Sequence, residues 1–472
     1  MLFYEPLFLT FFPFLYVLYL AVANRHAKKW ILLVASFLFY AWGEPLFVPV
    51  LMISTLIDYL LSERLSKESG ADDATRRTML GLGIANNLAV LVFYKYTDFL
   101  IENVNTLTST FGASPLPLLQ IALPIGVSFV VFEKITYLVD TYRGVSRKAT
   151  SFSDYCLFVL FFPKLLAGPI LKYHEMDRQI ANPPQFAWDD FWAGFTRLAR
   201  GMFKKLLIAD PLGAYADQIF AADPSGLSAA TAWIGVLCFT LQIYFDFSGY
   251  SDMAIGIARM FGFRLRENFN MPYIARSLTD FWQRWHISLT TFIRDYLYIP
   301  LGGNRVSNLK VYRNLWICFL LSGLWHGASW NFVLWGAYNG LFLTLDRIFL
   351  RRLLERAGPV ISTAATLVIV MVGWAIFRSP TIHHLGSFSL SMLGLGSGAI
   401  TLPIPPDVPY TLALGTFLSL LPATPVFTWL TQTWRTASWP HLIANGTYIL
   451  LYVIALSRAI AAPFQPFIYF RF

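Results

Sequence analysis

Charged residues are scarce in this sequence. Asp, Glu, Lys and Arg make up 13% of its 472 residues, about half the share that is usual in a soluble domain. Hydrophobic residues account for 56% and aromatic residues for 17%, more than a soluble core of this size can bury. The bilayer is the solvent that suits this composition, and we predict an all-α, polytopic integral membrane protein.

Cysteine is nearly absent as well. The three cysteines, Cys156, Cys238 and Cys318, are isolated within apolar runs, which argues against a disulfide framework and against a cysteine metal knuckle. There is no His-x-x-x-His pair, and His383 and His384 are adjacent in sequence. The spacing of these residues therefore predicts no metal site.

Linkers and a cleavable signal are also lacking. No Ser/Gly-rich or low-complexity tract divides the chain, so we predict one membrane domain over residues 1–472, with its functional core at about 120–350. Glu5 stands where a secretory signal would carry a basic residue, and the first apolar segment is predicted to be a retained span. The net charge of +9 is scattered over short loops, which argues against nucleic-acid binding.

Apolar runs that suit a bilayer recur along the whole chain. Roughly eleven are predicted to be spans, and they cover residues 6–23, 29–42, 45–62, 78–96, 118–139, 229–258, 312–328, 330–348, 360–377, 409–430 and 443–462. Prolines interrupt several of them, and the run 161–170, FFPKLLAGPI, is predicted to be re-entrant. Residues 264–313 mix arginines with Phe, Trp and Tyr and are predicted to form amphipathic helices at the cytoplasmic interface.

The basic residues predict an orientation. Loops 24–29, 63–77 and 140–151 carry Lys and Arg, whereas the turn near Gly43 and residues 97–117 carry neither. The positive-inside rule then places the amino terminus outside and the three basic loops in the cytoplasm.

Two histidines, His286 and His326, each follow a tryptophan and are the first candidates for chemistry, because titratable groups are costly in hydrocarbon. His326, in SGLWHG, is predicted to lie near the middle of the bilayer, where imidazole is well suited to exchange a proton near neutral pH. The alternative is a buried histidine satisfied by a backbone carbonyl. His286, in FWQRWHISL, is predicted to lie near the cytoplasmic face, where it either positions a donor substrate or forms part of an aromatic belt.

A group of polar residues interrupts the apolar run YFDFSGYSDMAIG. Asp246 and Tyr250 are four residues apart and share a helix face, a spacing that would allow them to act together. Asp252 is predicted to pair with Arg294 or Arg284. Such pairs lock helices together as often as they catalyse, and a structural role is the favoured interpretation of this group.

The motifs YFDFSGYSDMAIG, NFNMPY, FWQRWHISL, RDYLYIPLGGN and GLWHG together resemble the membrane-bound O-acyltransferase superfamily, and within it the bacterial branch of alginate O-acetyltransferases. The resemblance extends over nearly the whole chain, to the terminal FIYFRF, where Arg471 departs from the expected neutral amide. It implies that His326 is the catalytic histidine and that His286 is the second family histidine. It also implies a ring of helices around a central tunnel between a cytoplasmic donor and an external acceptor.

Further residues are expected to line this tunnel, namely Trp325, Trp285, Asp246, Tyr250, Asp252, Arg294, Asn268 and Asn304. The resemblance implies an acyl thioester as donor, either acetyl-CoA or an acyl carrier, and no tightly bound cofactor. It implies periplasmic proteins of polysaccharide acetylation as partners, and a location in the bacterial inner membrane.

The predicted activity is the transfer of an acyl group, acetyl in this branch, to hydroxyls of an extracytoplasmic polysaccharide, either directly or through a periplasmic relay protein. Two alternatives stay open. One is D-alanyl transfer toward teichoic acid, and the other is transport of the acyl group or of a glycan without catalysis. The sequence has no internal repeat of the kind that many transporters show.

Overall fold

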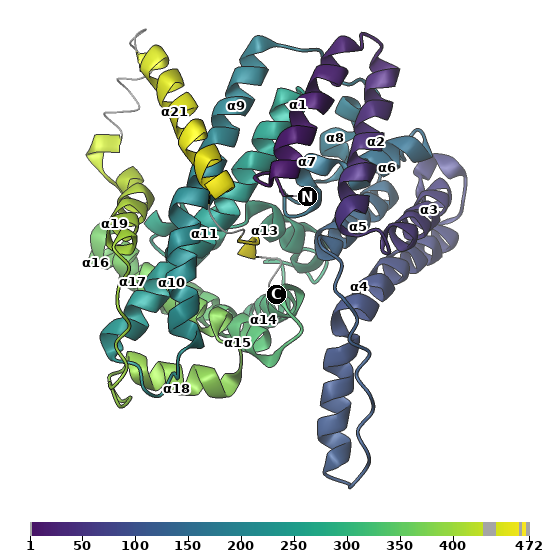
Figure 1. Ribbon diagram of the computed structural model, residues 1–472. Coiled ribbons are helices and arrows are strands. Elements are labelled where there is room, and N and C mark those ends of the chain that lie inside the picture. The colour runs from purple at the N-terminus through teal and green to yellow at the C-terminus, as the bar shows by residue number, and fades with distance from the viewer. Residues whose placement is uncertain (1, 428–439, 462–464, 469–472) are drawn as a thin grey trace. The chain divides into compact units, whose positions relative to one another are not determined.

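The computed structural model describes residues 2–427, 440–461 and 465–468 (Figure 1). Regular structure in these ranges is helical, apart from an isolated bridge between Leu227 and Ile400, so the all-α prediction is confirmed. Parts of the predicted spans 409–430 and 443–462 lie outside the described residues, as does Arg471.

A helix overlaps each of the eleven predicted spans, some of them only in part. These helices are α1 (Pro6–Ala21), α2 (Arg25–Gly43), α3 (Val48–Leu65), α4 (Asp73–Ser109), α5 (Val127–Arg143), α11 (Ala229–Met260), α14 (Asn308–His326), α15 (Trp330–Leu345), α17 (Pro359–Arg378), α19 (Asp407–Leu420) and α21 (Pro440–Ala461). Within the described ranges, α4, α11, α17 and the Ile443–Ala461 part of α21 are each long and apolar enough to cross a bilayer. The number of spans remains a prediction.

Shorter helices connect the long ones. They are α6 (Phe152–Leu160), α7 (Phe162–Leu165), α8 (Tyr173–Ala181), α9 (Trp188–Phe203), α10 (Asp210–Ala221), α12 (Leu278–Arg284), α13 (Ile287–Ile293), α16 (Arg351–Ala357), α18 (Ile382–Met392), the π-helices η2 (Lys204–Ala209), η4 (Arg294–Tyr298) and η5 (Asp346–Leu350), and the 3₁₀ turns η1 (Lys67–Ser69), η3 (Pro272–Ile274) and η6 (Leu421–Ala423). The chain groups into two compact units. Unit 1 comprises residues 1–195 and 254–266, and unit 2 comprises residues 196–253 and 267–472.

In unit 1, the boundary between α4 and α5 differs from the prediction. Helix α4 continues to Ser109, and α5 begins only at Val127, whereas spans were expected at 78–96 and 118–139. The connecting residues run back beside α4 (Figure 1), because the Asp98 carboxylate accepts hydrogen bonds from the backbone N–H groups of Leu119 (2.8 Å) and Ile121 (3.1 Å). This side-chain clamp uses backbone donors that a helix would otherwise need.

The proline-containing run 161–170 is broken, as predicted. Helix α6 ends at Leu160, Phe161 has ψ 102°, and α7 is only four residues long. Lys164 of α7 forms an ion pair with Glu133 of α5, and both side chains are buried. Entry of this run into the membrane from one side stays a prediction.

Replacement of Lys164 by Met is expected to lower the free energy of unfolding by about 3–5 kcal/mol, because Glu133 would be left as a buried carboxylate without its partner. Thermal unfolding of the detergent-purified protein measures this loss. The double variant Lys164→Met/Glu133→Gln removes both charges and should recover much of it. Equal losses in the single and double variants would show that the ion pair is not the cause.

In unit 2, α14 and α15 lie side by side (Figure 1) and approach unusually closely. A Cβ atom on Gly323 would lie 2.2 Å from the carbonyl oxygen of Phe332, and one on Gly336 would lie 2.4 Å from that of Phe319. Only glycine fits at these two positions. The close contact presses the last turn of α14, which carries His326, against α15.

Candidate functional site

His326 is the last residue of α14 and stands in a cage of aromatic rings. Its side chain is buried, and its ring centroid lies 4.9 Å from Trp325, 5.0 Å from Trp335 of α15 and 5.4 Å from Phe377 of α17. All three contacts are edge-to-face, a favourable geometry for aromatic rings. Three helices of unit 2 therefore hold this imidazole in surroundings that suit its uncharged form.

His286 lies between α12 and α13 in a strained backbone conformation. Its φ is +44° and its ψ is +54°, in the left-handed region that few residues other than glycine adopt. The backbone is held on both sides, because Ile287 N–H donates to the Asn268 carbonyl and Asn270 N–H donates to the Arg284 carbonyl, each at 2.9 Å. A strained residue fixed in this way, with its side chain fully buried, is typical of a functional position.

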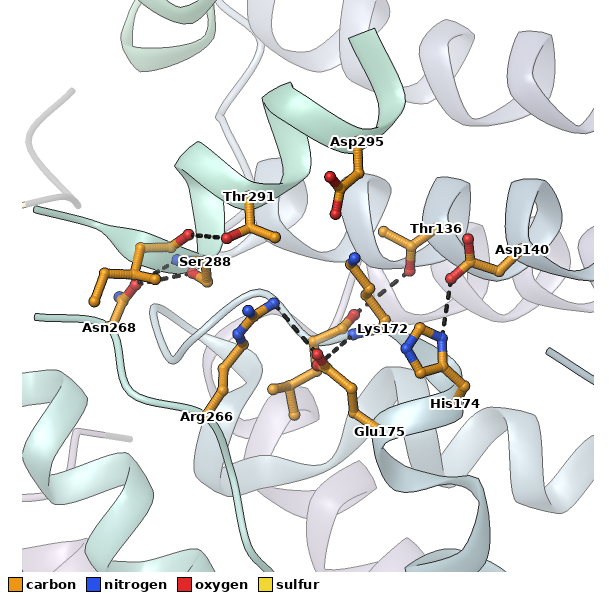
Figure 2. Close-up of polar contacts among 12 residues, drawn as sticks. Thr136, Asp140, Lys172, His174, Glu175, Arg266, Asn268, Ser288, Thr291 and Asp295 are labelled. Atoms are coloured by element: carbon orange, nitrogen blue, oxygen red, sulfur yellow. Dashed lines mark hydrogen bonds and ion pairs between the residues drawn. The ribbon is translucent and has the colours of Figure 1, made fainter. Parts of the chain in front are cut away.

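The side chain of Asn268 determines which nitrogen of His286 carries hydrogen. Asn268 Oδ1 accepts hydrogen bonds from the Ser288 backbone N–H at 3.2 Å and from its hydroxyl at 2.9 Å (Figure 2), and it lies 3.1 Å from His286 Nδ1. A backbone N–H can only donate, so the oxygen of the amide must face this way. His286 Nδ1 therefore carries the hydrogen, and the lone pair is on Nε2.

Burial also sets the charge of His286. Desolvation lowers the pKa of this imidazole to about 3, so the ring is neutral at physiological pH. The short helices α12 and α13 that flank it are not among the helices apolar enough to span a membrane.

A single indole connects the two histidines. The Trp325 ring centroid lies 4.9 Å from that of His326 and 6.1 Å from that of His286. Trp285, also predicted from sequence, packs instead on Trp374 at 4.9 Å and on Phe269 at 5.1 Å. The structure thus brings together His326, His286, Trp325 and Asn268, with Trp285 in the surrounding aromatic packing.

The polar residues of α11 are bound by groups that the sequence did not reveal. Asp246 Oδ1 lies 3.0 Å from Lys205 Nζ, and Asp246 Oδ2 accepts a hydrogen bond from the Ile468 backbone N–H at 2.8 Å. The Tyr250 ring packs against Phe467, with centroids 4.8 Å apart. These contacts agree with the structural interpretation of this group.

The predicted partner of Asp252 was wrong. Its carboxylate pairs with Arg197 at 2.9 Å and with Lys204 at 2.7 Å, because the α9–η2 helix, and not the segment 264–313, presents cations to this face of α11. The two expected partners, Arg294 and Arg284, instead pair with nearby carboxylates on their own segments, each at 2.7 Å.

Asp252 belongs to the wall of a pocket of about 570 Å³ in unit 2. The charged and polar residues that line it include Arg197, Arg200, Lys204, Asp252, Glu267 and Asn268. Three cations face two carboxylates, which leaves the pocket with a net positive charge. Apolar residues of the carboxyl-terminal helices, such as Leu418 and Leu451, complete the lining.

Arg200 is the cation best placed to meet a ligand. Arg197 is engaged by both Asp252 and Glu267, and Lys204 by Asp252, whereas exposed Arg200 donates to the uncharged Tyr448 hydroxyl at 3.1 Å. The sequence interpretation missed these cations. Positions 197, 200 and 204 recur at helical spacing, and this signal could have found them.

Two predicted tunnel residues lie in exposed networks. Asn304 is exposed, and its Oδ1 accepts hydrogen bonds from the Tyr298 hydroxyl at 2.7 Å and from Arg347 at 3.0 Å. Arg294, also on the surface, is paired with Asp295. A role of either residue in substrate passage stays a prediction.

Unit 1 has a polar cluster of its own (Figure 2). His174 Nδ1 lies 3.2 Å from the Asp140 carboxylate, and Arg266 lies 3.3 Å from Glu175. The hydrogen bond that the His174 imidazole donates to the Asp140 carboxylate raises the pKa of His174. Among the residues that the structure describes, no three His, Cys, Asp or Glu side chains are grouped so that they could hold a metal ion, and metal-free chemistry stays a prediction.

Comparison with known proteins identifies the relatives of this chain. The membrane-bound O-acyltransferase family matches residues 87–378, a range that holds both histidines. A probable alginate O-acetylase of Pseudomonas putida is 38% identical over 100% of both chains. A peptidoglycan O-acetyltransferase of Helicobacter pylori is 37% identical over 84% of this chain and 80% of its own length. A teichoic acid D-alanyltransferase of Bacillus subtilis is 25% identical over 55% of this chain and 70% of its own length.

Proposed function

The chain belongs to the membrane-bound O-acyltransferase family and is an O-acyltransferase, and on that premise we propose that it moves an acetyl group from a cytoplasmic thioester to hydroxyls of an extracytoplasmic polysaccharide. The observation that supports this proposal is that two buried histidines, His286 and His326, both pack near the indole of Trp325. Asn268, which contacts His286, also lines the pocket of net positive charge. The acceptor is reached directly or through periplasmic proteins of polysaccharide acetylation.

The comparisons favour acetyl as the transferred group. Relatives named as O-acetylases or O-acetyltransferases match 84–100% of the chain at 37–38% identity. The D-alanyltransferase relative matches 55% of it at 25% identity. Alginate and peptidoglycan, named in these relatives, are both extracytoplasmic polysaccharides, so the proposal specifies this acceptor class and not an individual polymer.

In the proposed mechanism, His326 is the general base. Its neutral imidazole takes the proton from the acceptor hydroxyl as the oxygen attacks the thioester carbonyl carbon. The C–O bond forms, the C–S bond breaks, and the departing thiolate takes the proton from the imidazolium. The products are an ester and a thiol, and His326 is neutral again. The aromatic cage of Trp325, Trp335 and Phe377 limits competing hydrolysis by excluding water.

His286 is proposed to position the donor. Because Asn268 fixes hydrogen on Nδ1, the Nε2 lone pair of this neutral ring can accept a hydrogen bond. An amide N–H of a pantetheine arm is a donor of the right kind. The left-handed backbone at His286 then keeps that acceptor in one place.

The charged pocket is proposed to bind the phosphates of the donor. Coenzyme A and carrier-bound phosphopantetheine both carry phosphate next to the pantetheine arm, and Arg binds phosphate through charge-assisted hydrogen bonds. Arg200 and Lys204 are two of the three cations that line this pocket, and Asn268, in its wall, contacts His286.

Reversal of the charge at Arg200 tests this assignment. Arg200→Glu is expected to raise the KM for acetyl-CoA about tenfold or more, because one charge-assisted phosphate contact is replaced by repulsion, while kcat changes little. Steady-state kinetics measures both constants. Arg351→Glu, at an exposed arginine on α16, is the matched control. A KM that rises equally in both variants, or in neither, would contradict the assignment.

The function itself is tested with purified protein in vesicles, radiolabelled acetyl-CoA on one side and a polysaccharide acceptor, with its periplasmic proteins, on the other. We expect label in a base-labile ester on the acceptor. A parallel reaction with a D-alanyl-loaded carrier tests the alternative acyl group. Passage of unreacted acetyl donor across the vesicle without any ester would favour a transporter.

A further inference from the structure

A short carboxyl-terminal segment, residues 465–468, is anchored in unit 2 by buried charged side chains. The Asp246 carboxylate, which is 1% exposed, accepts a hydrogen bond from the Ile468 backbone N–H at 2.8 Å. Lys205 Nζ donates to the Pro466 carbonyl at 3.4 Å. One side chain from α11 and one from η2 thus hold the backbone of the same segment.

These two side chains also bind each other. Lys205 Nζ lies 3.0 Å from Asp246 Oδ1 and 2.7 Å from Asp210 Oδ1. The removal of charges from water is costly even when they are paired, and apolar side chains would fill this space at lower cost. Lys205 also lies on a π-helix, a form that is often found at functional sites. Both features indicate that the position of the anchored segment matters.

Phe467 extends this anchor toward His286. The phenylalanine is fully buried, and its ring centroid lies 4.8 Å from that of Tyr250 and 5.8 Å from that of Phe247. Phe247 in turn meets the His286 ring edge-to-face at 4.7 Å. Asn268 fixes the Nδ1 side of the imidazole, while Phe247, backed by Phe467, supports the ring through an apolar contact.

We propose that residues 465–468 form a positioning strap for His286, in which Lys205 and Asp246 hold the backbone and Phe467 keeps Phe247 against the imidazole. This inference rests on the proposed acyl transfer, in which His286 positions the donor. Loss of the strap leaves the phosphate pocket intact but loosens His286, so the transfer step slows while donor affinity is kept.

The test compares two phenylalanines of unit 2 that are both fully buried. Phe467→Ala removes the contact behind Phe247. Phe388→Ala, on α18, removes a ring that packs on Phe220, outside the proposed site. We expect Phe467→Ala to lower kcat at least about tenfold, since small displacements at a reacting group have effects of this size or larger, with the KM for acetyl-CoA within about twofold. Phe388→Ala should lose comparable thermal stability with kcat within about twofold of wild type.

Equal kcat losses in the two variants, or no loss in Phe467→Ala, would contradict the proposal that residues 465–468 position His286. If Phe467→Ala does not accumulate, Phe467→Leu and Phe388→Leu decide by the same comparison. Lys205→Arg, which keeps the charge, should retain most of the activity, whereas Lys205→Met should lower kcat as Phe467→Ala does. An inactive wild-type protein would instead count against the proposed acyl transfer, so the two failures are distinguishable.

Discussion

Replacement of His326 by Ala is expected to abolish acyl transfer while the protein remains folded in the membrane. Loss of a general base slows a reaction by about 10²–10⁴-fold, and the aromatic cage around this ring (Trp325, Trp335 and Phe377) offers no substitute proton acceptor. The measurement is the rate of ester formation from radiolabelled acetyl-CoA. Size-exclusion elution and the thermal unfolding midpoint of the variant report on folding.

The affinity for the donor separates this result from a general defect. His326→Ala should bind acetyl-CoA as wild type does, because the site proposed for the phosphates is the pocket lined by Arg200 and Lys204. His326→Gln keeps much of the bulk of the ring but cannot act as a base near neutral pH, and it should be equally inactive. Substantial acyl transfer by either variant would show that His326 is not the general base.

Asn268→Ala is expected to have the second largest effect, a fall in kcat of about 10²-fold. The variant leaves the His286 Nδ1–H and the Ser288 N–H without the acceptor that now binds both, and buried unsatisfied donors are costly. The ring can then turn or change tautomer, and small misplacements of a positioning group cost this much in rate. The variant Ser288→Ala keeps the Asn268–His286 contact and should lose far less. Equal losses in the two variants would contradict the positioning role.

Asn268→Asp gives a directional result in pH. A carboxylate keeps the acceptor for both donors but favours the charged imidazolium, so it should raise the pKa of His286 above its value of about 3. In the proposed mechanism neutral His286 is the competent form, and its low pKa, about 3, keeps the ring of wild type neutral until the pH falls toward that value. The variant should begin to lose activity at a higher pH as the medium is acidified. The dependence of kcat/KM on pH, measured for both proteins, shows whether the acid limb moves in this direction.

The helices could be predicted from sequence because each apolar run has one strong physical reason to be helical, namely that a bilayer leaves no other partner for its backbone. The positions at which the helices begin and end could not be predicted. Helix α4 runs on to Ser109 and α5 starts late because Asp98 binds backbone N–H groups more than twenty positions further along the chain. Such a clamp is a tertiary contact, and it cannot be predicted from the local pattern of apolar residues.

Individual residues of the candidate site could be predicted from the sequence, but their arrangement in space could not. His326 stood out because it is titratable at the end of an apolar run, and His286 because it follows a tryptophan in the segment 264–313, which mixes arginines with aromatic residues. Their contact through Trp325 depends on how closely α14 and α15 approach at Gly323 and Gly336, a distance that sequence spacing does not contain. Trp325 was predicted as a tunnel residue, but its contact with both rings was not.

The charges around α11 show a different limit. The Asp252 carboxylate was expected to bind an arginine of the interfacial segment, and it binds Arg197 and Lys204 instead. The carboxylate was visible in the sequence, but its partner depends on which helix packs on that face. The π-helical turn that carries Lys204 and Lys205 leaves no comparable local signal, so the direction of these two side chains could not be inferred.

In the proposed reaction, a thioester carbonyl meets His326 while the phosphates of its donor are bound at Arg200. An experimental structure with a non-hydrolysable thioether analogue of acetyl-CoA tests this most directly. We expect the phosphates of the analogue on Arg200 and Lys204, and its carbonyl carbon within roughly 4 Å of the His326 ring, close to the separation of reacting groups before attack. An analogue bound elsewhere, with the His326 ring sealed away from it by its aromatic neighbours, would show that His326 is not the general base for this donor.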